Sequence, residues 1–334
     1  MKAAVLYGPR DLRVEPAPDP TAAAGEILVR VRAAGLCGTD YRIWSGDRPV
    51  RYPLILGHEF IGEVAAVGEG VENVKPGDPV AVEPNYSCGA CSLCLEGNRN
   101  LCPRRTAVGI DVPGGFAQLA RVPARCCWPA PAGLSDEQLL LTEPLAVVVR
   151  AVARGEVKPG TTAAVLGVGT LGLLALQVLR ARGARVLAVG RTDRRLDLAR
   201  QLGAHAAHSL ASGPGREAAR TFSGREGVDI VVETAGTPEA VAEAIELARP
   251  GGRVVLTGLP HEPSQVNFFW VVRRELSLIG SMIYQDEFPE AMRLLEGSAV
   301  TVGPLVTHRF SLEAIHDAFA AHRQPDSIKV AVIP

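Results

Sequence analysis

The sequence lacks an excess of charge of either sign. Its 35 Lys and Arg residues nearly balance 36 Asp and Glu residues, so the formal net charge is −1 over 334 residues. Proteins that bind nucleic acids or anionic membranes through charge carry a clear excess of Lys and Arg. We therefore expect neither nucleic acid nor a membrane as a partner.

Long apolar runs are also missing. The most apolar stretch, 139–149, is interrupted by Glu143 and Pro144 and is too short to cross a bilayer of about 30 Å. Charged residues are scattered through 1–16, where a signal peptide needs an unbroken apolar segment. We expect no membrane span and a chain that starts in its own fold.

Cysteine is scarce and unevenly placed. There are seven cysteines, and four of them lie within 88–102. An odd number with such clustering is typical of metal binding in a reducing compartment rather than of disulfides. The sequence therefore predicts a cytoplasmic protein with a metal site.

The texture of the sequence changes twice along the chain. Residues 1–143 are rich in Gly and Pro with short Val-rich runs, which is typical of strands in a barrel or partly open β-domain. Residues 144–280 alternate between β-branched runs and helical segments, a pattern that predicts a parallel sheet with crossover helices. From 281 onwards, two amphipathic helices and a final strand are expected to fold back on the first zone. A chain this long predicts about two domains.

A glycine-rich turn follows directly on the apolar run 163–166. The turn consists of Gly167, Val168, Gly169, Thr170, Leu171 and Gly172. Its glycines permit a tight turn, close approach of a pyrophosphate, and packing of the next helix on the strand. The phosphates then lie at the helix N-terminus. The turn predicts a dinucleotide site, with a glycine turn in another kind of α/β protein as the alternative.

The choice of dinucleotide is read at the end of the following strand. An NAD enzyme usually carries an acid there, whereas this chain has Gly190, Arg191 and Thr192. The glycine leaves room for a 2′-phosphate, which Arg191 and Thr192 can bind, and Arg195 adds positive charge. This pattern favours NADP over NAD. The alternative is that Arg191 is a solvated loop residue and Asp193 binds the ribose of NAD.

Four cysteines are spaced as metal ligands: Cys88, Cys91, Cys94 and Cys102. Four thiolates can close a tetrahedron around zinc, which would stabilise a lobe, 85–105, that has no core of its own. An iron–sulfur cluster is the alternative, but a ferredoxin run has three residues before its last cysteine. A nucleic-acid-binding zinc ribbon fits poorly with a short lobe in a nearly neutral protein.

A second group of candidate ligands is dispersed: Cys37, His58, Glu59 and Glu143. A thiolate, an imidazole and a carboxylate can bind zinc and leave a fourth position open for water or substrate. Taken singly, each residue has another explanation, namely a buried thiol, a hydrogen-bonded histidine or a glutamate at a helix start. Spacing alone does not join them.

The order of these motifs resembles that of the zinc-containing medium-chain alcohol dehydrogenases. The four-cysteine lobe lies between His58 and the glycine turn, and further matches at 77–80, 114–117, 250–252 and Lys329 extend along nearly the whole chain. Glu143, followed by Pro-Leu-Ala, is similar to the sorbitol and threonine dehydrogenase branch. The resemblance implies a GroES-like β-rich catalytic domain, 1–144 and 282–334, a Rossmann doubly wound parallel-sheet domain, 145–281, and an active site in the cleft between them.

The resemblance also implies two zinc ions per chain, one structural and one catalytic. Cys37, His58 and Glu59 would bind the catalytic ion, with Glu143 bound directly or through water. Thr39 would hand on the proton of the alcohol. Many relatives continue this relay with a histidine at the position of Arg42, which cannot act as a base; water, or Asp40 through water, is the substitute.

Residues around the nicotinamide are implied in the same way: Thr257, Gly258, Leu259, Ser281, Met282 and Ile283. Lys329 corresponds to a pyrophosphate contact. Trp44 and Tyr284 are candidates for the wall of the substrate pocket or for plain packing.

The function implied is hydride transfer between a secondary alcohol, such as a polyol, sugar alcohol, cyclitol or amino alcohol, and NADP(H). One alternative is a simple secondary-alcohol or aldehyde reductase. Another is a catalytically inert dinucleotide-binding protein with a structural or regulatory role. The resemblance further implies a homo-oligomer, either a dimer or a tetramer.

Overall fold

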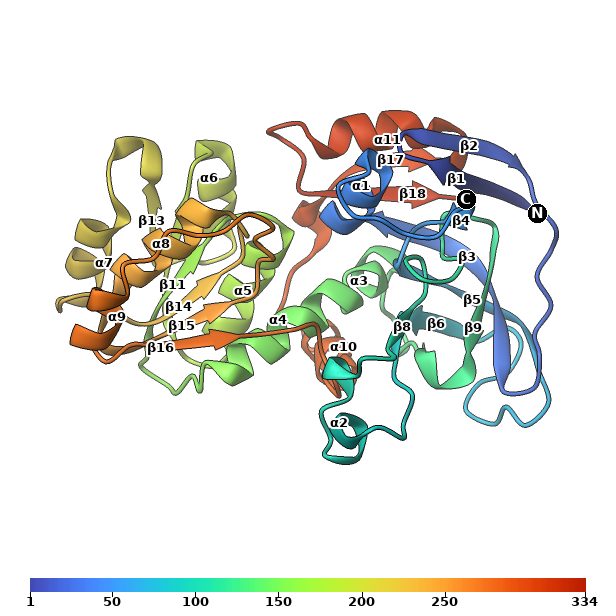
Figure 1. Cartoon of the computed structure of the whole chain (residues 1–334), viewed down its shortest axis with the longest axis horizontal. Helices are drawn as coiled ribbons and strands as arrows, with labels where there is room; N and C mark the ends of the chain where they lie inside the picture. The colour runs from blue at the N-terminus through green and yellow to red at the C-terminus, as the bar shows by residue number, and fades with distance from the viewer. The chain divides into compact units, whose positions relative to one another are not determined.

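A computed structural model describes all 334 residues and divides the chain into two compact units. Unit 1 comprises 1–143, 291–296 and 302–334, and unit 2 comprises 144–290 and 297–301. Figure 1 labels most of their helices and strands. None of the helices combines the length and the apolar composition that a membrane span requires.

The largest sheet of unit 1 has seven strands in the order β10-β6-β5-β3-β18-β17, with β9 also paired to β3. The strands are β3 (Glu26–Leu36), β5 (Glu59–Val67), β6 (Pro79–Val82), β9 (Leu119–Pro123), β10 (Cys127–Pro129), β17 (Val306–Ser311) and β18 (Lys329–Ile333). Only β17 and β18 are parallel neighbours. Buried Ile27, Val29 and Val31 alternate with less buried residues in β3, so one face of this strand lies on the core.

Smaller elements complete unit 1. A three-stranded sheet has the order β2-β1-β4, and a two-stranded sheet pairs β7 with β8. These strands are β1 (Lys2–Gly8), β2 (Asp11–Pro16), β4 (Leu54–Ile55), β7 (Asn85–Tyr86) and β8 (Thr106–Ala107). The helices are α1 (Gly38–Ser45), α2 (Ser92–Leu95), α3 (Asp136–Leu140) and α11 (Ile315–His322). The core joins β1, β3, β5 and α11 through Leu6, Val29, Phe60 and Phe319.

Unit 2 contains a parallel sheet of six strands in the order β13-β12-β11-β14-β15-β16. The strands are β11 (Thr162–Leu166), β12 (Arg185–Gly190), β13 (Ala206–Ser209), β14 (Val228–Glu233), β15 (Ala248–Leu256) and β16 (Ser277–Gly280). Relative to the chain, this is the strand order 3-2-1-4-5-6 of a Rossmann sheet. The predicted fold class is therefore confirmed for this unit.

Helices connect these strands and pack around the sheet (Figure 1). They are α5 (Thr170–Ala181), α6 (Asp193–Gln201), α7 (Gly215–Ser223), α8 (Pro238–Leu247) and α9 (Phe268–Arg273). In such a sheet, ligands bind at the carboxyl ends of the strands, beside the point where the strand order reverses. That point lies between the paired strands β11 and β14. The turn after β11 therefore lies at the candidate cofactor site.

Two helices belong partly to each unit, namely α4 (Thr142–Arg154) and α10 (Phe288–Glu296). The segment 282–290 groups with unit 2, and the boundary after residue 281 stays a prediction. Two charged contacts join this segment to other parts of unit 2. Arg150 donates to Glu287 at 3.2 Å, and Arg182 is paired with Glu290.

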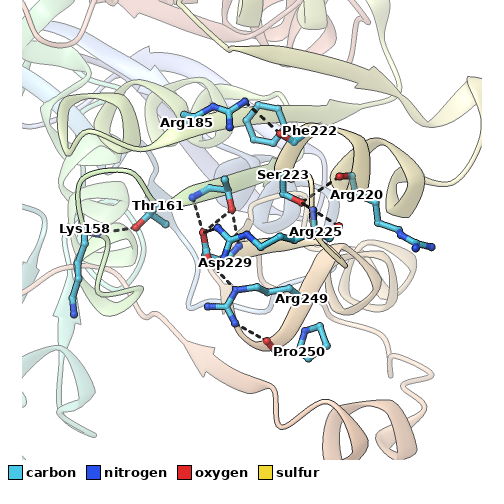
Figure 2. A network of polar contacts seen from close by, with 11 residues as sticks. Lys158, Thr161, Arg185, Arg220, Phe222, Ser223, Arg225, Asp229, Arg249 and Pro250 are labelled. Carbon is cyan, nitrogen blue, oxygen red and sulfur yellow. Dashed lines mark hydrogen bonds and ion pairs between the residues drawn. The ribbon is translucent and has the colours of Figure 1, made fainter.

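The amino ends of β11 and β14 are joined by a polar network around Asp229 (Figure 2). Its carboxylate accepts hydrogen bonds from the backbone N–H of Thr162 at 2.8 Å, the Thr162 hydroxyl at 2.6 Å and Arg249 at 2.7 Å. Burial raises the pKa of Asp229, but Thr162, Arg249 and Arg225 outweigh burial and lower it. Both oxygens of Asp229 thus have partners within the chain, and the network stabilises the amino ends of the central strands, opposite the candidate cofactor site.

Candidate metal and cofactor sites

The four cysteines of the predicted structural site converge on one point. Cys91 is the N-cap of α2, Cys94 lies in that helix, and Cys102 ends a short 3₁₀ turn. The Sγ atoms are 3.5 Å apart for Cys91 and Cys94, 3.8 Å for Cys91 and Cys102, 3.5 Å for Cys102 and Cys88, and 4.0 Å for Cys88 and Cys94. Sulfurs bound at about 2.3 Å to a tetrahedral zinc lie about 3.8 Å apart, so the cluster fits zinc.

The electrostatics of this cluster agree with metal binding. Backbone N–H groups of Ala90 and Cys91 help to lower the pKa of Cys88 to about 6, and Arg104 donates to its sulfur at 3.2 Å. The backbone N–H of Cys94 lowers the pKa of Cys91, but desolvation and the neighbouring sulfurs outweigh it and raise the pKa to about 11. Four close thiols cannot all ionise without a cation among them.

The second cluster is assembled by the pairing of β3 with β5. Cys37 follows β3, and His58 and Glu59 lie at the start of β5, whose antiparallel register sets Glu59 opposite Gly35. One ligand atom from each of Cys37, His58 and Glu59 lies within 4.8 Å of the others. The structure thus brings together three of the four residues predicted to bind the catalytic metal.

Asp40, which was not predicted as a ligand, contacts two members of this cluster, Cys37 and His58. It is fully buried in α1, accepts the backbone N–H of Cys37 at 2.9 Å, and lies 3.2 Å from Nδ1 of His58. A histidine held at Nδ1 presents Nε2 to a metal. Burial lowers the pKa of His58, but Asp40 outweighs burial and holds it well above the usual value. The negative field that favours a proton also favours a metal cation.

Lys329 belongs to the same cluster. Its buried Nζ donates to Glu59 at 2.5 Å and to the carbonyl of Leu36 at 3.5 Å. Burial lowers the pKa of Lys329, but Glu59, Cys37 and Glu143 together raise it above the usual value. Gly35 is required beside this pair, because a Cβ there would lie 2.5 Å from the Glu59 carboxylate. The ammonium group thus has a partner in unit 1, and a pyrophosphate contact stays a prediction.

Glu143, Thr39 and Arg42 lie around this cluster rather than in it. Glu143 is buried in the first turn of α4, and its charge acts on Lys329, but it is not one of the three residues within 4.8 Å. Thr39 and Arg42 lie on α1, beside Asp40. The direct binding of Glu143 to the metal and the proton role of Thr39 remain proposals.

The glycine turn has the expected geometry in unit 2. Gly167 has a φ of 99°, and a Cβ there would lie 2.9 Å from the backbone N of Ala235. A Cβ at Gly172 would lie 1.7 Å from the carbonyl oxygen of Gly167, so the helix can approach the turn only without a side chain. Gly169 is the N-cap of α5 and has open space beside it. The turn therefore leaves the start of α5 accessible to a phosphate.

Gly190 is explained partly by packing. A Cβ at this position would lie 2.5 Å from a methyl group of Val168, whereas the sequence analysis explained the glycine by the room it leaves for a 2′-phosphate. Arg191 is exposed, and its charge lowers the pKa of Glu239 after the backbone and Thr237 do so. Thr192 is the N-cap residue of α6.

Strand ends of the same sheet carry the residues expected near the nicotinamide. Thr257 follows β15 and Ser281 follows β16, and both side chains are buried with hydroxyl groups that lack a hydrogen-bond partner. Leu259 is exposed. Unpartnered buried hydroxyl groups are uncommon in proteins and need an explanation. Contacts of Thr257 and Ser281 with the nicotinamide stay a prediction.

The two aromatic candidates for a pocket wall are packed. The ring of Trp44 lies 5.4 Å from that of Phe319 and 5.3 Å from that of Tyr41. Tyr284 is 2% exposed, and its ring lies 5.0 Å from that of Phe288. For both residues the structure gives the packing explanation.

Two family models match the chain. The one described as alcohol dehydrogenase GroES-like domain matches residues 23–132, and the one described as zinc-binding dehydrogenase matches residues 170–297. Sorbitol dehydrogenase of Bacillus subtilis is 35% identical over 343 residues, covering 100% of this chain and 97% of the relative. L-threonine 3-dehydrogenase of Bacillus velezensis is 36% identical over 326 residues, covering 95% of this chain and 94% of the relative.

Solved structures of zinc-binding and alcohol dehydrogenases are also similar to this chain. A zinc-binding dehydrogenase of Sinorhizobium meliloti 1021 bound to NADP has a TM-score of 0.96 and 34% identity, covering 100% of this chain and 99% of that one. A dehydrogenase of Escherichia coli CFT073 complexed with NADH has a TM-score of 0.94 and 33% identity, with coverage of 100% and 99%. The chain belongs to the zinc-containing medium-chain alcohol dehydrogenases, in the sorbitol and threonine dehydrogenase branch. It is an oxidoreductase with a GroES-like domain and a Rossmann domain, as the resemblance implied.

Proposed function

We propose that the chain transfers a hydride between a secondary alcohol and NADP(H), with a catalytic zinc bound by Cys37, His58 and Glu59. The observation that carries the proposal is the convergence of a thiol, an imidazole and a carboxylate within 4.8 Å, supported from behind by buried Asp40. Three protein ligands leave one position for substrate, as a catalytic zinc site needs. Glu143 is the candidate for a further ligand, through water or directly; direct binding would keep a position for substrate only if the zinc became five-coordinate.

A zinc ion held by these residues would act as a Lewis acid that lowers the pKa of an alcohol hydroxyl and, in the reverse direction, polarises a ketone carbonyl. Asp40 holds the ring of His58 in place, and Lys329 holds Glu59. Thr39 is proposed to accept the hydroxyl proton of the substrate as it donates its own hydroxyl proton to a water molecule. Arg42 cannot take that proton as a base, so water, or Asp40 through water, is proposed to receive it.

The proposed structural zinc is bound by Cys88, Cys91, Cys94 and Cys102. Its support is the match between their sulfur separations and the edge of a zinc tetrahedron. Such a site has no open position, and its role is to fold the lobe at 85–105.

NADP is proposed as the preferred dinucleotide, although relatives bind either form. The support is Arg191 at the end of β12, with Thr192 and Arg195 beside it and no acid at Gly190. Arg191→Ala is expected to weaken NADP binding by about 1–3 kcal/mol and to leave NAD binding unchanged, because only NADP carries the 2′-phosphate. Fluorescence titration with NADPH and NADH measures both affinities, and equal losses would contradict the assignment.

The proposed substrates are polyols, sugar alcohols, cyclitols or amino alcohols. The support is the similarity to sorbitol and threonine dehydrogenases and the Glu143 motif. A panel of these alcohols and of simple ketones, assayed with NADP and NAD in parallel, tests the proposal. A preference for simple alcohols and aldehydes would favour a plain reductase, and rates with NAD equal to or above those with NADP would overturn the cofactor assignment.

A homo-oligomer, dimer or tetramer, and a cytoplasmic location are further parts of the proposal. Seven free thiols support a reducing compartment. Light scattering of the purified protein at its working concentration tests the oligomeric state, and a monomer would contradict it.

A further inference from the structure

A buried carboxylate stands at the carboxyl end of β14, beside the glycine turn. Glu233 is 0% exposed, and one of its oxygens accepts the backbone N–H groups of Ala235 at 2.6 Å and Gly236 at 2.7 Å. The other oxygen, Oε2, lacks a hydrogen-bond partner. Burying an acid with one oxygen unpaired costs free energy. Glu233 therefore requires an explanation beyond packing.

The next residue, Thr234, contacts the glycine turn. The hydroxyl of Thr234 lies 3.2 Å from the carbonyl of Leu166 and 3.0 Å from that of Gly167, and it donates to this pair. The same oxygen would lie 3.0 Å from a Cβ at Gly172. Thr234 therefore fixes the start of the turn against β14 and fits there only because the turn carries glycines.

Glu233 also supports the turn after β15. A Cβ at Gly258 would lie 2.8 Å from Oε2 of Glu233 and 2.3 Å from the backbone N of Gly236. Gly236 has a φ of 66°, and a Cβ there would lie 2.9 Å from the backbone N of Leu259. The turns after β14 and β15 are thus packed backbone to backbone, with the buried carboxylate between them.

We propose that Glu233 and Thr234 are positioning residues for the dinucleotide, which hold the turns after β11, β14 and β15 in binding geometry before the cofactor arrives. This inference rests on the proposed function, because it assumes that the dinucleotide binds along these three turns. Neither side chain needs to touch the cofactor. Glu233 acts through the backbone of Gly236 and Gly258, and Thr234 acts through the backbone of Gly167.

The chemistry of the two side chains suits this role. Neighbouring N–H groups that turn inward need an acceptor with two lone pairs, which a carboxylate oxygen provides and an apolar side chain does not. Burial raises the pKa of Glu233 above its usual value, because it outweighs the hydrogen bonds from Gly236 and Ala235, which lower the pKa. The opposite end of β14 differs: Asp229 there has a hydrogen bond or ion pair at both oxygens. Strand β14 thus carries Asp229 at its amino end, with both oxygens paired, and Glu233 at its carboxyl end, with one oxygen unpaired.

The test compares Glu233→Leu and Thr234→Val with wild-type enzyme. Glu233→Leu keeps a side chain of similar size but removes the oxygen that accepts the N–H groups of Ala235 and Gly236. Thr234→Val removes the hydroxyl and keeps the branch. We expect dinucleotide affinity, measured by titration of NADPH fluorescence, to fall about 10- to 100-fold in each variant. The KM for the dinucleotide should rise and the KM for the alcohol should stay unchanged. The conservative variants Glu233→Gln, which keeps one accepting oxygen, and Thr234→Ser, which keeps the hydroxyl, should retain an affinity close to that of wild type.

Asp229→Asn is the matched control, because it alters an acid at the other end of the same strand. It should lower thermal stability without changing the affinity for NADPH at a temperature where the protein is folded. Zinc content and far-ultraviolet circular dichroism are measured for all variants. These measurements separate a loss of folded protein from a loss of affinity for NADPH.

Three other outcomes count against the inference. Wild-type affinity in both Glu233→Leu and Thr234→Val would overturn it. A reduced number of binding sites with unchanged affinity, or unfolding of both variants while Asp229→Asn folds, would assign Glu233 and Thr234 to structure alone and also overturn it. If wild-type protein bound neither NADPH nor NADH, the proposed function itself would fail, which is a distinct result.

Discussion

The two metal-ligand clusters of unit 1 are built in opposite ways. The four cysteines come from one segment of the chain, 88–102, and their sulfurs already form a closed tetrahedron. Cys37, His58 and Glu59 come from the ends of two paired strands, and a third strand, β18, contributes Lys329. The first cluster depends on local chain geometry, and the second depends on the fold.

This difference separates stability from reactivity. A closed set of four thiolates leaves no position for substrate, so a metal bound there would only stabilise the lobe. A set of three unlike ligands leaves a position open, and it has buried support from Asp40 and Lys329. Such supporting contacts fix ligand orientation and tune the metal.

The largest expected effect follows from removing one ligand of the open cluster. Cys37→Ala should lower kcat/KM by roughly 10³-fold or more, because the Lewis acid contributes several kcal/mol of transition-state stabilisation. Steady-state assays with the best alcohol of the panel measure the loss. Cys126→Ala alters a buried thiol outside both clusters and should retain activity. Full turnover in Cys37→Ala would show that the two clusters do not differ as described.

Removing one ligand of the closed cluster should instead destabilise the protein. Cys91→Ser should release one zinc and expose the lobe at 85–105 to proteases, because metal binding there is local folding energy. Activity per folded molecule should change by less than about 10-fold. Limited proteolysis with mass spectrometry locates the cleavage, with Ser92→Ala as the control. Loss of turnover without any cleavage in the lobe would reverse the assignment of the two sites.

A smaller effect is expected from the support behind the open cluster. Asp40→Asn removes the charge that holds His58 and should weaken binding of the catalytic zinc about 10- to 100-fold. Competition with a chelator measures this, and the structural zinc should resist the chelator as in wild type. Asp47→Asn, an exposed acid just after the same helix, is the control. Identical chelator curves for Asp40→Asn and wild type would remove Asp40 from the account.

The smallest effect is expected at a polar cluster that needs no metal. Asp229→Asn should lower the free energy of unfolding by about 1–3 kcal/mol at neutral pH. The pKa of Asp229 is lowered in the folded state, so this contribution is present above about pH 4, near the unfolded pKa, and is lost as pH falls further. Urea unfolding at several pH values measures the difference from wild type, with exposed Asp197→Asn as the control. A difference that grows toward acid pH would contradict the sign.

Sequence reasoning predicted the features that depend on local chain geometry. The glycine turn at 167–172 and the cysteine spacing at 88–102 each have their meaning within a short segment. The Rossmann sheet followed from the alternation of strands and helices, and the family followed from motif order. Cys37, His58 and Glu59 could be grouped only by resemblance, because the register of β3 and β5 brings them together.

The supporting residues could not be predicted in this way. Lys329 and Glu59 are 270 residues apart in sequence, and nothing local to either residue indicates the pair. Asp40 did leave a signal, because it stands three residues after Cys37 at the start of a helix, where an acid caps the backbone. Glu233 left none, because its importance comes from the turns after three strands.

The most direct test of the central claim is the zinc content of purified wild-type protein and of Cys37→Ala, measured by inductively coupled plasma mass spectrometry. The account predicts two zinc ions per chain in wild type and one in Cys37→Ala, with the remaining ion in the four-cysteine lobe. One ion in wild type, or two in Cys37→Ala, would contradict it.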